Sequence, residues 1–165
     1  MDIFDEELLS LWRHLNECGV KYIMVGGVAT NFNGYQRSTD DIDLWIDDNT
    51  ENRERLRQAF KKCGMGDFYM LNTMPIIPGW TDFQLNSGLR LDLLLNMKGL
   101  EGFSFEESLE LASIAEIEGV RVPFLQLNQL IANKKAVNRP KDQVDVIYLE
   151  KIREMREKEE GGTGA

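Results

Sequence analysis

The sequence predicts an α+β fold: a mixed β-sheet flanked by helices, followed by a pair of helices at the C-terminal end. Apolar residues recur at helical spacing in residues 5–18 and 50–63. Apolar residues at every second position, Ile42, Leu44 and Ile46, mark a strand at residues 41–46. Near the C-terminus, two further stretches with helical spacing, residues 125–137 and 141–158, are separated by Asn-Arg-Pro. Helices and strands therefore alternate along the chain, and two helices end it.

The first half begins with a helix that Gly19 ends, and the apolar segment 21–25 follows as a strand. The helix at residues 50–63 starts at Thr50, a residue type that caps helices, and stops before a second Cys-Gly pair. The segment 67–71 then has the composition of another strand.

The second half begins with a hairpin over residues 80–95, because alternating leucines follow the turn sequence Asn-Ser-Gly. Residues 104–127 predict a short helix and two short strands joined at Glu118-Gly119. Pro140 suits the first turn of the last helix.

The composition is that of one domain. The chain has 165 residues, 42% of them hydrophobic, which is enough for one core without disulfides. We assign residues 1–158 to a single domain and expect the polar segment 159–165 to be a disordered tail. No apolar run approaches the roughly 20 residues of a membrane span, and the start is acidic. We therefore expect a cytoplasmic protein with no membrane partner.

The charge distribution is uneven. The formal net charge of −9 disfavours sequence-independent binding of nucleic acid. Cationic residues concentrate in residues 132–142, apart from the acidic segment at residues 40–54. This separation favours a cleft that holds a polyanionic small molecule. The alternative is that Lys134, Lys135 and Lys141 are solvated charges on a helix surface.

Two carboxylates share one face of the strand at residues 41–46. Ile42, Leu44 and Ile46 fall on one face, so Asp41 and Asp43 project from the other. Residues two apart on a strand are separated by roughly 6.5–7 Å, close enough for two carboxylates to share one divalent cation or bridge two. Because like charges repel, the pair indicates a bound cation.

Two further features point to phosphate chemistry. Gly26-Gly27 follows the first strand directly, where the absence of side chains lets backbone amides approach a phosphate. Asp92 lies between apolar neighbours that face the other way. Three carboxylates on one sheet face supply the oxygen ligands and negative charge that metal ions of phosphoryl transfer require.

These residues resemble a known family. The stretches GGVATNFNGYQRSTDDIDLWI and LIANKKAVNRPKDQVDVIYLE, together with Asp92, look like the polymerase-beta-type nucleotidyltransferase superfamily. The resemblance is to its small prokaryotic members, which include toxins of toxin–antitoxin systems and lincosamide or aminoglycoside nucleotidyltransferases. It covers nearly the whole chain apart from the ends.

The resemblance implies roles for single residues. Asp41 and Asp43 would be metal ligands, and Asp92 would bind a second metal or accept the proton of the attacking hydroxyl. Gly26 and Gly27 would contact the triphosphate through backbone amides, although the commoner Gly-Ser form of this turn is absent. The remaining nucleotide-binding positions that it implies are Arg37, Thr39 and Lys134. Lys134 would then face the aspartates across the space of a triphosphate, and Lys135 would point to solvent.

The implied activity is transfer of a nucleoside monophosphate from a nucleoside triphosphate to a hydroxyl acceptor, with release of pyrophosphate. The implied cofactor is Mg²⁺, with Mn²⁺ as the alternative, and two ions would accompany the bound nucleotide. The acceptor stays open between a small molecule, an RNA end such as that of tRNA, and a protein, and an antitoxin or a second copy is a candidate partner. The alternative function is an inactive member that binds a nucleotide or a protein.

Overall fold

A six-stranded mixed sheet organises the chain. The computed structural model describes residues 5–77 and 79–163. The strands are β1 (Tyr22–Val25), β2 (Asp41–Ile46), β3 (Trp80–Gln84), β4 (Arg90–Leu94), β5 (Ser113–Ile117) and β6 (Val120–Phe124). Their order is β3-β4-β2-β1-β6-β5, in which β2/β4 and β1/β6 are parallel pairs and the other pairs are antiparallel. The predicted mixed sheet is confirmed.

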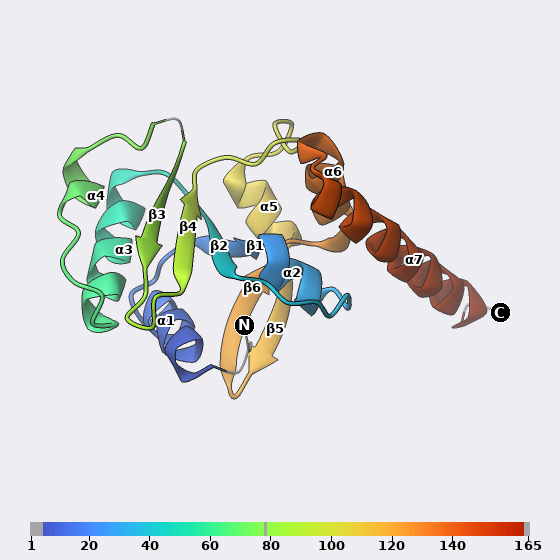
Figure 1. Ribbon diagram of the computed structural model, residues 1–165, viewed down its shortest axis with the longest axis horizontal. Helices are drawn as coiled ribbons and strands as arrows, with labels where there is room; N and C mark the ends of the chain where they lie inside the picture. Colours follow the sequence, from blue (N-terminus) through green and yellow to red (C-terminus); the bar gives the residue numbers. More distant parts are fainter. Residues whose placement is uncertain (1–4, 78, 164–165) are drawn as a thin grey trace.

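Helices lie on both sides of this sheet (Figure 1). They are α1 (Glu6–Glu17), α2 (Gly26–Phe32), α3 (Thr50–Lys62), α4 (Met70–Thr73), α5 (Phe105–Leu111), α6 (Leu127–Val137) and α7 (Pro140–Thr163). α7 packs against α6 at its start and then extends away from the sheet toward the C-terminus (Figure 1). None of the described helices is long and apolar enough to cross a membrane.

One face of the sheet carries the main core. Ile42, Leu44 and Ile46 are fully buried there. α1 covers this face through Trp12, whose indole N–H lies 3.3 Å from the sulfur of Met24 on β1. α3 contributes Phe60, another fully buried ring. Because this face of β2 is committed to the core, the alternate residues of β2 must point to the other face.

The segment at residues 67–71 is not the strand that the sequence predicts. It approaches α3 as an irregular loop, and the short helix α4 begins at Met70. Asp67 is bound to Arg57 of α3 through two hydrogen bonds of 2.5 and 2.9 Å, and Phe68 packs edge-on against Phe60 with ring centroids 5.9 Å apart. These contacts fix the segment to α3, and β3 forms the edge of the sheet instead.

Two helix boundaries also differ from expectation. The side chain of Asn49, not that of Thr50, caps α3 by accepting a hydrogen bond of 2.8 Å from the amide of Asn52. α7 continues through Thr163, into the segment 159–165 that we expected to be disordered, and residues 164–165 lie outside the described residues. The Glu- and Lys-rich sequence before this segment has high helix propensity and carries the helix onward.

Candidate active site

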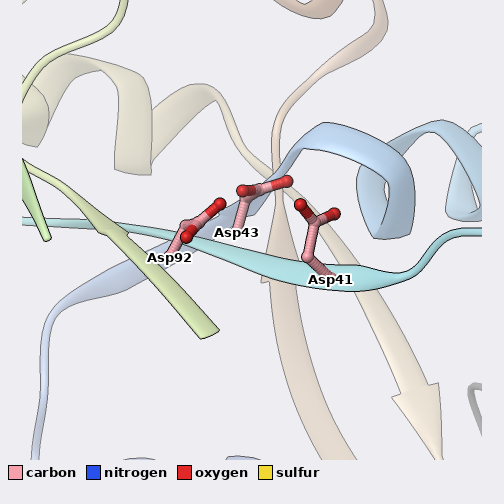
Figure 2. Close-up of side chains that lie close together, drawn as sticks. All are labelled: Asp41, Asp43 and Asp92. Atoms are coloured by element: carbon pink, nitrogen blue, oxygen red, sulfur yellow. The ribbon is translucent and has the colours of Figure 1, made fainter. Parts of the chain in front are cut away.

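Three carboxylates meet on the face of the sheet opposite the main core. β2 and β4 run parallel, and their register places Asp43 beside Asp92, while Asp41 lies two residues earlier on β2. One carboxylate oxygen from each of the three lies within 4.8 Å of the others. Figure 2 shows the three side chains on the same side of the two strands, with Asp43 between the other two. The structure thus brings together the three acids that the sequence singles out.

This convergence changes the acidity of the central group. Burial raises the pKa of Asp43 to about 7, and the negative charges of Asp41 and Asp92 and a hydrogen bond with Asp92 add to the rise. The ammonium of Lys141 acts in the opposite direction. Without a metal ion, the cluster therefore holds a proton near neutral pH that an isolated aspartate would release.

Arg90 is a site residue that we did not single out from the sequence. Its Nε donates a hydrogen bond of 2.7 Å to Oδ1 of Asp92, and the same nitrogen lies 3.7 Å from Oδ2 of Asp82 on β3. The alternation of β4 already places Arg90 on the face of Asp92. The parallel register, which places Arg90 beside Asp41, is what brings its charge into the cluster.

The Gly-Gly turn lies against the same acids. α2 begins at Gly26 directly after β1, with a positive φ of 63°. A Cβ at Gly26 would lie 2.0 Å from Oδ2 of Asp43, and one at Gly27 would lie 2.4 Å from Oγ1 of Thr39. Neither position has room for a side chain, so the bare backbone borders the cleft.

Thr39 has a contact within the protein. It is buried, and its hydroxyl donates a hydrogen bond of 3.1 Å to the carbonyl oxygen of Asp41. This bond fixes the chain at the start of β2. Thr39 therefore positions the first aspartate, and it also lines the cleft between Gly27 and Asp41.

Arg37 and Lys134 belong to a charge network made of Arg37, Lys134, Arg139, Asp142 and Asp145, in which Lys134 and the two aspartates are buried. Arg37 donates hydrogen bonds of 2.8 Å to both carboxylate oxygens of Asp145. Lys134 is 4% exposed, and its Nζ lies 2.7 Å from Asp145 and 3.7 Å from Asp142. Arg139 donates a hydrogen bond of 2.7 Å to Asp142. Three cations and two anions leave the network a net charge of +1.

The network alters the arrangement expected for Lys134. The residue lines the cleft, but its ammonium is bound to Asp145 and does not stand free across from the aspartates. A buried ammonium without a counter-charge would be strongly destabilising, so α7 supplies the carboxylates. Lys135 points outward as expected and pairs with Glu150 at 2.6 Å.

The network also affects acidity. Burial alone would raise the pKa of Asp145, but hydrogen bonds from Arg37 and Lys134 outweigh it, and the pKa lies below its ordinary value. Asp145 is therefore ionised at neutral pH. It ties the loop before β2 to both C-terminal helices, and these three segments border the cleft.

A cleft of about 640 Å³ connects these groups. The acids form its floor on β2 and β4, and the Gly-Gly turn borders them. Lys98 and Lys141 also line it, and neither forms an ion pair with any residue that the structure describes. Lys141 belongs to the basic stretch seen in the sequence, whereas nothing in the sequence around Lys98 identified it. Both ammonium groups are available to a ligand.

The order of the sheet and its flanking helices define the class of protein: this is a nucleotidyltransferase fold. Residues 4–162 match the family described as nucleotidyl transferase of unknown function (DUF2204), and the chain belongs to this family. A comparison with curated proteins gives no match.

Solved structures agree with this fold. The lincosamide antibiotic adenylyltransferase LnuA, determined with lincomycin bound, is 17% identical, with a TM-score of 0.61 over 90% of this chain and 97% of that chain. ANT(2'')-Ia in complex with adenylyl-2''-tobramycin is 18% identical, with a TM-score of 0.55 over 90% of this chain and 92% of that chain. An antigenic nucleotidyltransferase-like protein from Paracoccidioides brasiliensis is 15% identical, with a TM-score of 0.51 over 87% of this chain and 72% of that chain. At these identities the similarity establishes the fold.

The charge network predicts a large effect of one substitution on stability. Asp145→Asn leaves Arg37 and Lys134 without their shared carboxylate, so we expect the free energy of unfolding at pH 7 to fall by about 3 kcal/mol. The more exposed pair of Lys135 and Glu150 is the matched control, and Glu150→Gln should leave the free energy of unfolding nearly unchanged. Urea denaturation measures both. Because the pKa of Asp145 is lowered by folding, the difference should shrink as the pH falls below about 4. Equal effects of the two substitutions would contradict the network.

The acidic cluster predicts a substitution that stabilises the metal-free protein. Folding raises the pKa of Asp43 from 3.8 to about 7, so the folded state loses stability as the pH rises through this window. The asparagine in Asp43→Asn carries no charge, so this variant does not lose stability in this way. In chelator at pH 8 the variant should be more stable by on the order of 2 kcal/mol, and the gain should disappear near pH 4. Thermal melts across this pH range test it, with the exposed Asp40→Asn as control. A variant that is less stable at pH 8 would show that Asp43 supports the fold.

Proposed function

We propose that this protein is a magnesium-dependent nucleotidyltransferase that transfers a nucleoside monophosphate from a nucleoside triphosphate to a hydroxyl group and releases pyrophosphate. The observation that carries the proposal is the cluster of Asp41, Asp43 and Asp92 beside the Gly26-Gly27 turn in one cleft. A structural role for the acids would instead pair each with a cation. Of these three acids, only Asp92 forms an ion pair with a residue that the structure describes, namely Arg90.

The donor set fits a hard divalent cation. Carboxylate oxygens are the ligands that Mg²⁺ selects, and three carboxylates share this site with one ion pair between them and Arg90. Asp41 and Asp43 would hold the ion shared with the nucleotide, and Asp92 would join Asp43 in holding a second. Bound metal would neutralise charge on the phosphates and on the departing pyrophosphate.

The protein groups have complementary roles. The backbone amides at the start of α2 would contact the triphosphate, and Gly26 and Gly27 leave them open to it. Lys98 and Lys141 would bind phosphate oxygens, because Arg37 and Lys134 are already committed to Asp145. Asp92 would accept the proton of the attacking hydroxyl at Oδ2, since Arg90 binds Oδ1.

The acceptor is best supported as a small molecule. Two of the similar structures contain an antibiotic or an adenylylated antibiotic, and they match this chain over nearly its full length. The net charge of −9 also disfavours an RNA acceptor. An RNA end, a protein side chain, an antitoxin and a second copy remain the alternatives that the sequence analysis raised.

The test of the activity is label transfer from nucleotide. The purified protein is incubated with each of the four nucleoside triphosphates labelled at the α-phosphate, Mg²⁺, and total RNA, lysate protein or small molecules. We expect transfer that requires Mg²⁺ and disappears in Asp43→Asn, while Asp40→Asn retains it. Binding of triphosphate should likewise require Mg²⁺. Tight Mg²⁺-dependent binding without transfer to any fraction would favour the inactive alternative.

A second prediction separates the lysines. Lys141→Ala should weaken binding of magnesium nucleotide by about 1–2 kcal/mol, which is roughly 5- to 30-fold in Kd, with unchanged stability. Lys135→Ala, whose side chain points outward, is the matched control and should bind as the wild type does. Lys134→Ala should lower the free energy of unfolding, because it leaves Asp145 partly unpaired. Calorimetric titration with a non-hydrolysable analogue measures the affinities. Equal losses from Lys141 and Lys135 would refute the assignment.

A further inference from the structure

Large apolar side chains are exposed together on the segment that leads into β3. Tyr69, Met70, Met74, Ile77 and Trp80 are all exposed, and Ile77 and Trp80 reach 80% and 48%. All of them except Tyr69 border a groove of about 340 Å³, which we call the apolar groove; its wall includes Met70, Leu71, Met74, Ile77, Trp80 and Phe83. A folded domain that leaves so many large apolar side chains in one place gains by covering them with a ligand.

The apolar groove adjoins the catalytic cleft on a defined side. The sheet order β3-β4-β2 places β3 next to the strand of Asp92, and on the far side of that strand from Asp41 and Asp43. Cross-strand register sets Asp82 beside Asp92 and Trp80 beside Leu94. Among the described residues, Trp80 alone lines both the cleft and the groove. Trp80 is therefore the residue at which the groove and the cleft meet, on the strand next to that of Asp92.

Charge separates the two ends of this combined surface. Lys98, Arg139 and Lys141 line the cleft, which suits a triphosphate. The groove is different, because Asp82 is the one charged residue among its described lining residues. A polyanion would find no cation among these lining residues, and Asp82 itself is paired with Arg90 at 3.7 Å. The chemistry of the groove fits a molecule with an apolar surface that is uncharged or cationic.

We propose that the apolar groove binds the apolar part of the hydroxyl acceptor, a small uncharged or cationic molecule, with Trp80 as the wall that directs it toward Asp92. This rests on the proposed function. The acceptor oxygen would form a bond to the α-phosphorus while the bond from that phosphorus to the oxygen of the leaving pyrophosphate breaks. The acceptor proton would pass to Asp92. The volume of the groove is in the range of small-molecule sites.

The alternative occupant is the base of the nucleotide. A base in the groove would lie apart from the phosphate-binding cations, since those line the cleft and the groove has no cation among its described lining residues. The two occupants predict opposite outcomes in competition. An acceptor site binds its ligand together with magnesium nucleotide, whereas a base site loses an apolar ligand when nucleotide binds.

The first experiment uses N-phenyl-1-naphthylamine, an uncharged apolar molecule whose fluorescence rises on binding. Ile77→Asp places a charge in the groove at a highly exposed position, and Ile114→Asp is the matched control on β5 at the opposite edge of the sheet. We expect Ile77→Asp to raise the Kd for the probe at least tenfold and Ile114→Asp to leave it unchanged. Saturating magnesium nucleotide should not displace the probe, and Ile77→Asp should bind nucleotide as the wild type does. Equal probe affinity in both variants, or displacement by nucleotide, would overturn the proposal.

The second experiment connects the groove to transfer. Small molecules from a cell extract are separated by reversed-phase chromatography and offered with α-labelled nucleotide and Mg²⁺. We expect label on compounds retained by the apolar column, at least tenfold less with Ile77→Asp, and unchanged with Ile114→Asp. Label on unretained compounds, on RNA or on protein, or equal labelling by Ile77→Asp, would refute the groove proposal while the proposed function stood. Absence of transfer to every fraction would refute both.

Discussion

Burial of one face of β2 is the constraint on which the site depends. Ile42, Leu44 and Ile46 are fully buried in the core. A shift of the strand by one residue would therefore bury the carboxylates and expose the leucine and the two isoleucines. This fixed register turns Asp41 and Asp43 to the open face. β4 is held by the same logic, because Leu91 and Leu93 are buried and Asp92 alternates with them. The acids therefore converge because the core requires it.

The site keeps opposite charges apart although they lie in one cleft. The charge network pairs Arg37, Lys134 and Arg139 with Asp142 and Asp145. These three cations therefore do not form ion pairs with the acids on the floor of the cleft. Lys98 and Lys141 stay available at the cleft wall. On the floor, Arg90 binds only one of the three acids. The remaining negative charge is repulsive, and a bound metal ion would relieve the repulsion.

Several contacts fix the segments that surround the cleft. The Gly-Gly turn has no room for side chains, Thr39 fixes the start of β2, and Asp145 joins the loop before β2 to α6 and α7. The exposed apolar residues lie apart from this rigid framework, along β3 and the segment that precedes it. The acids lie on the inner strands β2 and β4, whereas these apolar residues lie at the edge strand β3.

The sequence by itself determined the mixed sheet, the two terminal helices, the three acids and the Gly-Gly turn, because alternation and turn chemistry act over a few residues. It could not assign the partners of Lys134 or the place of Arg90, Lys98 and Trp80. Lys134 and Asp145 are on one helical hairpin, but Arg37 reaches them from over a hundred residues away. The segment 67–71 has strand composition, yet its contacts with α3 decide otherwise. Ion-pair partners and packing contacts of this kind join residues that are distant in the sequence. Only the tertiary structure decides which of them come together.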